Sequence, residues 1–180
     1  MSWLVDHEET RRFLERYVAR LDLPTERLRV TTERREFERW LGRRLRGAIG
    51  GAYAFAPASN EHLILINLPR IDHSRPRSVE VVVAEELLHM RDRLDGDFRR
   101  HAKHGYDRIA HRVSALTGAT LEEIRASLVP PKRRQARYLY SCPSCGVCVP
   151  RQQQGTWSCG RCAPQFDPQF ILLLRSTAGT

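Results

Sequence analysis

The sequence predicts an α+β fold, in which a main domain of helices packed on a few strands is followed by a small cysteine-rich module. Three observations lead to this prediction. Helical and β-like apolar patterns alternate through residues 1–129. A Pro-Pro pair and a run of Lys and Arg then form a typical linker at 130–137. All five cysteines follow this linker, so we expect the module to occupy residues 138–180.

Length and composition exclude several classes of protein. With 41% hydrophobic and 28% charged residues, this chain of 180 residues can bury a core and is not a disordered polymer. No run approaches the roughly 18 apolar residues of a membrane span. The segment 1–9 becomes acidic too early for a signal peptide. We therefore expect a cytoplasmic monomer with no membrane partner.

Apolar spacing predicts the elements of the first part of the chain. A helix is expected over 6–21, where Asp6 and Glu9 have the spacing of a capping box. A short alternating strand follows over 28–32, and a second helix follows over 34–46. Three histidines give no signal and are expected at the surface: His7, His62 and His73.

A strand hairpin comes next, and two short helices end the main domain. The β-like runs 52–56 and 62–68 flank a Pro-Ala-Ser-Asn segment that is typical of a turn. After the central helix described below, helical spacing returns over 106–116. A last short helix is predicted to begin at Thr120, which forms a capping box with Glu123.

The central helix is expected over 77–94, because Pro76 precedes it in a position that favours a helix start. Its middle is apolar on most sides except at Glu80, Glu85 and Glu86. Burying an unpaired charge is costly. These carboxylates therefore require a structural or functional partner.

The cysteines form the most specific motif in the chain. Cys142-x2-Cys145 and Cys159-x2-Cys162 are separated by thirteen residues, a spacing that predicts a zinc ribbon with one structural Zn held by four thiolates. Two disulfides or a redox pair are the alternatives, but the compartment and the sequence context do not favour them. Cys148 is then a spare thiol.

Basic residues are concentrated in the second part of the chain. The net charge is +9, and from residue 130 onward seven cations face only Asp167, a balance of +6. Such a surface attracts polyanions, nucleic acid first, and the alternative is a basic surface that only aids solubility. Three aromatic residues can stack on bases or pack around the small core: Tyr138, Tyr140 and Trp157. The expected nucleic-acid-binding residues are Lys132, Arg133, Arg134 and Arg137.

The central helix also carries a metal-binding pattern. Glu85 and His89 lie one helical turn apart on one face, as the two histidines do in the motif H-E-x-x-H. A third ligand has to come from further along the chain, where His104 is the best candidate and His101 and His111 are its rivals.

These residues together resemble the SprT-like metalloproteases, a family with a zincin-type domain whose eukaryotic member cleaves proteins crosslinked to DNA. The resemblance covers roughly residues 45–175, and its matching pieces are Ala52-Tyr53, Ile64 to Asn67, Val82 to His89, His104-Gly105 and Tyr140 to Cys162. The resemblance implies that Glu86 is the general base and that His89 and His104 bind the catalytic metal. Glu85 stands where the family has its first histidine.

A carboxylate ligand has predictable consequences for such a site. Zinc accepts carboxylate oxygen, and a set of two histidines and one glutamate is a known catalytic set. The carboxylate lowers the net charge of the metal centre from +2 to +1, which weakens Lewis-acid catalysis by the metal. A carboxylate ligand also makes Mn or Fe credible occupants besides Zn. Alternatively the site holds no metal, with Glu85 paired to Arg91 or Arg93, and His89 is a satisfied core histidine.

The sequence therefore predicts a SprT-like metal-dependent peptidase that acts on DNA-associated proteins. The alternative is a catalytically inactive SprT-like scaffold that serves as a nucleic-acid-binding zinc-ribbon module. The third hypothesis is a structural interaction protein with no nucleic-acid partner.

Overall fold

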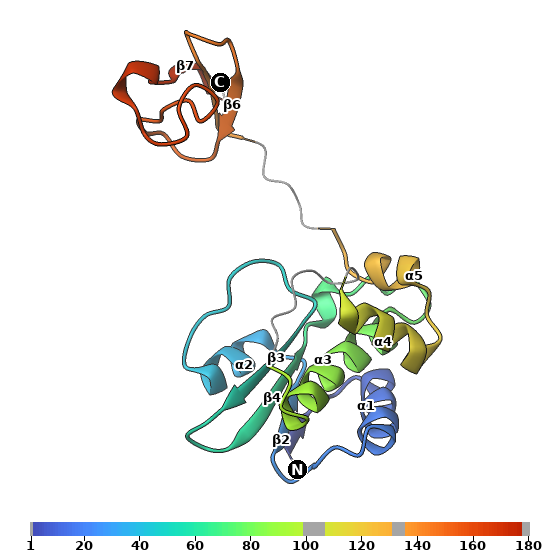
Figure 1. The fold of residues 1–180 in the computed structure, drawn as a ribbon. Helices are drawn as coiled ribbons and strands as arrows, with labels where there is room; N and C mark the ends of the chain where they lie inside the picture. The colour runs from blue at the N-terminus through green and yellow to red at the C-terminus, as the bar shows by residue number, and fades with distance from the viewer. Residues whose placement is uncertain (1, 99–106, 131–135, 178–180) are drawn as a thin grey trace. The chain divides into compact units, whose positions relative to one another are not determined.

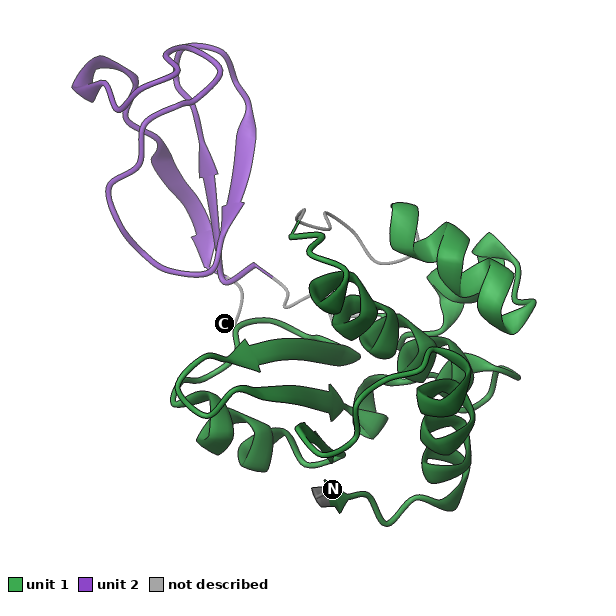
Figure 2. Ribbon diagram, turned by 60° about the horizontal axis from the view of Figure 1, so that its bottom comes forward, with its two compact units in different colours: residues 1–130 green, residues 131–180 purple. Residues whose placement is uncertain are grey.

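The computed structural model describes residues 2–98, 107–130 and 136–177 (Figure 1). The chain divides into two compact units, unit 1 over Met1–Pro130 and unit 2 over Pro131–Thr180 (Figure 2). Helices and small sheets are both present, so the predicted α+β class is confirmed. Among the described residues, no helix combines the length and the apolarity that crossing a membrane requires.

Unit 1 is built on a four-stranded sheet with the order β1-β2-β4-β3. Its strands are β1 (Ser2–Leu4), β2 (Leu28–Thr31), β3 (Gly51–Ala56) and β4 (Glu61–Ile66). β1, β2 and β4 are parallel to one another, whereas β3 pairs with β4 in the antiparallel direction. β3 is therefore an edge strand that runs against the rest of the sheet.

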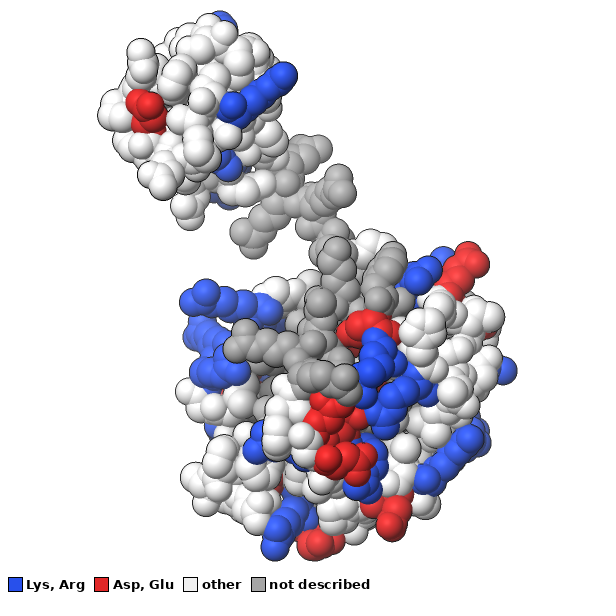
Figure 3. Space-filling model, in the orientation of Figure 1, with Lys and Arg blue, Asp and Glu red and all other residues white. Residues whose placement is uncertain are grey.

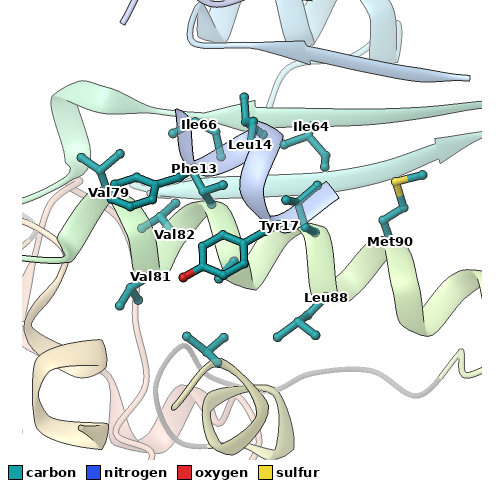
Figure 4. Close-up of a cluster of buried hydrophobic side chains, with 14 of the residues drawn as sticks. Phe13, Leu14, Tyr17, Ile64, Ile66, Val79, Val81, Val82, Leu88 and Met90 are labelled. Atoms are coloured by element: carbon teal, nitrogen blue, oxygen red, sulfur yellow. The ribbon is translucent and has the colours of Figure 1, made fainter. Parts of the chain in front are cut away.

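Helices lie on both faces of this sheet, and the last two helices of the unit pack against the long central helix rather than against the strands (Figure 1). They are α1 (Glu8–Arg20), α2 (Arg34–Leu41), α3 (Ser78–Leu94), α4 (Arg108–Thr117) and α5 (Leu121–Ala126), with a short 3-10 helix, η1 (Leu68–Arg70), after β4. Because side chains alternate along a strand, β4 contributes to two cores. Ile64 and Ile66 pack in the main core with α1 and α3 (Figure 4). Leu63 and Leu65 pack with Phe37 of α2 on the other face.

α3 is the best-buried helix, and two of its acidic residues have clear structural partners. The Tyr17 hydroxyl donates a hydrogen bond of 2.5 Å to Glu80, which ties α1 to α3. Asp92 accepts hydrogen bonds from Arg108 and Arg112 of α4. These contacts account for the carboxylates at both ends of α3, while Glu85 and Glu86 in its middle require a separate account.

The element boundaries differ from the predictions at three points. β1 was not expected, and it exists through its parallel pairing with β2. α1 is capped by His7, whose Nδ1 accepts from the Thr10 N–H at 3.3 Å, so the expected cap at Asp6 is wrong. α2 ends at Gly42, which adopts a left-handed φ of 69°, rather than continuing to residue 46. The capping box of Thr120 and Glu123 is confirmed.

Unit 2 is a three-stranded antiparallel sheet with a very small core. β5 (Tyr138–Ser141) lies between β6 (Cys148–Arg151) and β7 (Leu173–Thr177), and η2 (Pro168–Phe170) is a single 3-10 turn before β7. The buried hydrophobic residues of this unit are few: Tyr140, Cys142, Cys159 and Leu172. Two of these four are cysteines, so the metal-binding sulfurs form part of the core.

Candidate metal centre and catalytic helix

Four cysteines of unit 2 are arranged to hold one metal ion. The Sγ atoms of Cys142 and Cys162 are 3.7 Å apart, and those of Cys145 and Cys159 are 3.6 Å apart. All four sulfurs lie within 4.8 Å of one another. Tetrahedral zinc with Zn–S bonds of about 2.3 Å requires sulfur separations of roughly 3.8 Å. The predicted four-cysteine centre is thus formed, and its geometry suits structural zinc.

The backbone around each cysteine pair turns tightly enough to bring its two sulfurs together. β5 ends at Ser141 and delivers Cys142, whose carbonyl accepts from the Gly146 N–H at 2.9 Å. Gly146 has a φ of 72°, a conformation that favours glycine. In the second pair, the Cys162 N–H donates to the Cys159 carbonyl at 3.1 Å. Each turn depends on contacts within a few residues, so the motif spacing alone was sufficient to predict it.

The electrostatics of the cluster also favour a cation. Backbone N–H groups of Cys145 and Ser144 lower the pKa of the Cys142 thiol to about 6. Burial, with a further contribution from the neighbouring sulfurs, raises the pKa of Cys162 to about 12. Four thiolates at this distance repel one another unless a positive charge lies between them. Cys148 is exposed and does not belong to the cluster, as the prediction of a spare thiol requires.

The aromatic residues Tyr138, Tyr140 and Trp157 pack in or against the small core of unit 2. Tyr140 is buried, and Tyr138 and Trp157 pack against it. The Tyr140 hydroxyl accepts from the Gly155 N–H at 3.2 Å, and the guanidinium of Arg151 lies 4.6 Å from the centre of the Trp157 ring. Of the two roles considered for these rings, packing is the one that their contacts support.

In unit 1, α3 presents Glu85 and His89 on its half-buried side. Both residues are partly accessible, whereas most of the helix around them is buried. Glu86, the next residue along the helix, is only 6% exposed. The two neighbouring carboxylates therefore differ in burial, with Glu85 partly accessible and Glu86 buried.

The Glu86 side chain lies directly against the backbone of β3. A Cβ atom built on Gly51 would lie 2.3 Å from Glu86 Oε1, so only glycine fits at this position without displacement. Burial, and to a smaller extent the charge of Glu85, raises the pKa of Glu86 well above its usual value. Among the described residues, none forms a hydrogen bond or an ion pair with Glu86. A buried carboxylate in such a position is typical of a functional site.

A second polar cluster lies further along β3 and α3. The Tyr53 hydroxyl is 2.9 Å from His62 Nδ1, and the Phe55 ring centroid lies 5.1 Å from that of His62. The guanidinium of Arg93 lies 4.3 Å from the centre of the Phe55 ring. Burial raises the pKa of Tyr53 to about 12 and lowers the pKa of His62.

The expectation that His62 is a surface residue is wrong, because it is 4% exposed. It shares one face of β4 with Ile64 and Ile66, which form part of the main core. The alternation along this strand was the signal in the sequence that places His62 inside. His73, in contrast, is exposed as expected.

The remaining predicted site residues are distributed as follows. His101, His104, Lys132, Arg133 and Arg134 lie outside the described residues. Arg137 is exposed before β5, and His111 is exposed on α4. Arg91, one of the partners considered for Glu85, forms an ion pair with Asp95 at 2.5 Å. Within the described ranges, the four cysteines are the only group of three or more metal-ligating side chains that lie close together.

Comparisons of the chain with protein-family models, with curated proteins and with solved structures find no match. The functional argument therefore depends on the residues themselves and on their arrangement.

Proposed function

We propose that this chain is a SprT-like metal-dependent peptidase that acts on DNA-associated proteins. One observation carries the proposal. The buried carboxylate of Glu86 lies against the edge strand β3, on the same helix as Glu85 and His89. This arrangement supports roles for Glu86 as a base, for Glu85 and His89 as metal ligands and for β3 as a strand that holds a peptide.

The donor set suits a divalent cation. A carboxylate oxygen and an imidazole nitrogen are acceptable ligands for Zn, and for Mn or Fe as well. Glu85 and His89 would hold the ion together with a third ligand, for which His104 remains the proposed residue. When bound, the ion would supply Lewis acidity to the peptide carbonyl.

Glu86 is the proposed general base. As the oxygen of a water molecule forms a bond to the peptide carbonyl carbon, the carboxylate takes one proton from that water. When the C–N bond breaks, the same group gives this proton to the leaving amine nitrogen. Gly51 supports this role, because the absence of a side chain leaves room for the carboxylate beside β3.

The edge strand supports the proposal that the substrate is a peptide. Within the described part of the chain, β3 pairs with β4 only, so its other edge keeps backbone donors and acceptors unpaired. An extended peptide can add to such an edge through main-chain hydrogen bonds, with little demand on its side chains. Substrate choice would then depend mainly on where the enzyme binds.

The direct test is proteolysis of a DNA-bound protein by the wild type and by Glu86→Gln. We expect the variant to lose activity by about 10²- to 10⁴-fold, the usual contribution of a general base. Glu122→Gln, on the exposed side of α5, is the matched control and should keep full activity. Equal cleavage by wild type and Glu86→Gln would exclude Glu86 from the reaction.

The second candidate function is a non-catalytic scaffold that binds nucleic acid. It is favoured by one observation: among the described residues, only the four cysteines form a cluster of potential metal ligands. Metal content measured by mass spectrometry distinguishes the two functions. For the peptidase, we expect two ions per chain, falling to one in Cys142→Ser/Cys145→Ser and to one in Glu85→Ala/His89→Ala. For the scaffold, the wild type holds one ion, and only the cysteine variant loses it.

A further inference from the structure

A hollow of about 660 Å³ lies beside α2 and the chain that follows it. Five arginines line it together with one acidic residue and one leucine: Arg34, Arg35, Arg39, Arg43, Arg44, Glu38 and Leu45. Five cations and one anion give the lining a formal charge of +4. Figure 3 shows basic side chains gathered over this part of unit 1.

Two of these arginines form an ion pair with a carboxylate. Arg34 pairs with Glu38 at 2.9 Å, and Arg39 pairs with Glu36. Among the described residues, no ion pair involves Arg35, Arg43 or Arg44, which are all exposed. We call these three residues the arginine triad.

The loop that carries Arg43 and Arg44 is held in place without using their side chains. Arg34 donates to the carbonyl of Leu45 at 2.6 Å and to that of Gly47 at 3.1 Å. Glu38 accepts from the Leu45 N–H at 3.0 Å. The ion pair on α2 therefore fixes the loop, and the triad is left available for a ligand. A site that is already ordered loses less entropy when it binds.

We propose that the arginine triad binds the phosphate backbone of a nucleic acid, through residues other than those of the predicted basic linker. Guanidinium groups match phosphate oxygens through paired hydrogen bonds, and several phosphates in a row can engage several such groups at once. An anionic membrane is the less suitable partner, because membrane-surface sites combine basic with exposed apolar residues. The large exposed hydrophobic residues of the described chain include none between residues 33 and 50.

The arginine triad lies close in the chain to the proposed active site of the peptidase. Binding of a nucleic acid by the triad does not itself depend on catalysis. Gly51, which contacts Glu86, lies seven positions after Arg44 in the chain. A chain of this length spans at most about 25 Å. A nucleic acid held by the triad would therefore lie near the edge strand, where a protein attached to it is within reach.

The test compares two full-length variants that lose equal charge. Arg35→Gln/Arg43→Gln/Arg44→Gln removes the triad, and Arg12→Gln/Arg20→Gln/Arg27→Gln removes three exposed arginines elsewhere on unit 1. Fluorescence anisotropy over a salt series is measured with labelled duplex DNA, single-stranded DNA and single-stranded RNA. We expect the triad variant to bind its preferred strand at least about tenfold more weakly, with a salt slope lower by about 2 to 3. The control should stay within about twofold of wild type.

Three results would overturn the proposal. Equal weakening in both variants would mean that only net charge matters, and unchanged binding by the triad variant would exclude this surface. Loss of binding to vesicles that contain phosphatidylserine, with nucleic-acid binding intact, would assign the triad to a membrane. The variant Arg35→Lys/Arg43→Lys/Arg44→Lys keeps the charge and should keep most of the salt slope, so it separates a lost contact from a misfolded protein.

Discussion

The two candidate metal sites of this protein are built in different ways. The cysteine centre takes all its ligands from residues 142–162, and its sulfurs already lie within 4.8 Å of one another. The proposed site on α3 takes only Glu85 and His89 from the helix itself, and it relies on the packing of α3 against β3 to place Glu86. A site made by local turns can be predicted from spacing, whereas a site made by packing depends on the whole fold of its unit.

Removal of the cysteine ligands should cause the largest loss of stability. The core of unit 2 is so small that bound zinc, worth roughly 10 kcal/mol or more in comparable zinc modules, would supply most of the folding free energy of this unit. We expect Cys142→Ser/Cys145→Ser to unfold unit 2 and to leave unit 1 folded. Near-ultraviolet circular dichroism of Trp157 and the thermal transition of unit 1 measure the two effects. A Trp157 signal that survives in the variant would contradict a metal-dependent fold.

Asp92→Asn should destabilise unit 1 by about 1.5–3 kcal/mol, because it removes the buried charge that accepts from Arg108 and Arg112, although Arg108 keeps its ion pair with Asp97. The same change tests whether the catalytic helix depends on packing at its far end, since Asp92 joins α3 to α4. Urea denaturation monitored at unit 1 gives the free energy of unfolding. Asp95→Asn removes only the exposed partner of Arg91 and should cost less than about 1 kcal/mol. Equal losses in the two variants would argue against a special role for the buried network.

Gly51→Ala should destabilise unit 1 by about 1–3 kcal/mol, since the new methyl group would meet the Glu86 carboxylate. It should also reduce proteolysis by roughly a hundredfold, because a displaced base loses its alignment with the attacked bond. In the Glu86→Ala background, the same glycine substitution should cost less stability, because the carboxylate that it meets is gone. An equal cost in both backgrounds would show that β3 is sensitive for another reason.

The pH dependence of unit 1 should show the smallest effect. Burial lowers the pKa of His62 in the folded protein, so below about pH 6.5 the unfolded chain takes up a proton that the folded chain resists. The free energy of unfolding therefore falls as the pH drops below 6.5, and it levels off below the folded pKa. His62→Gln can keep the contact with Tyr53 and should lose this part of the pH dependence. An unchanged profile in the variant would assign the effect to other groups.

Most of the fold follows from patterns that are strong over short distances. The hairpin of β3 and β4, the helix after residue 77 and the capping box at Thr120 all appear close to their predicted positions. β1 could not be found, because a strand of three residues shows no periodicity and exists only through its partner β2. The end of α2 was misplaced because helical spacing continues to Leu45, which instead belongs to the loop fixed by Arg34 and packs against the core around Phe37.

The candidate sites were predictable to different degrees for the same reason. The four cysteines follow from their spacing, and Glu85 and His89 follow from helical geometry. The contact of Glu86 with Gly51 joins segments far apart in the sequence, so no local pattern reveals it. The hollow beside α2 is lined only by residues 34–45, but its shape depends on how the loop after α2 folds back on the helix. The third ligand of the proposed metal site on α3 would also come from further along the chain, so local spacing does not identify it either.

The exposed thiol of Cys148 offers a direct way to follow the metal in unit 2. With zinc bound, the four ligand sulfurs are shielded from alkylation, and a maleimide dye would label Cys148 alone. After chelation, the number of reactive sulfhydryls should rise from one toward five, since all five cysteines are free of disulfides. The protein therefore carries an internal reporter of its own metal occupancy.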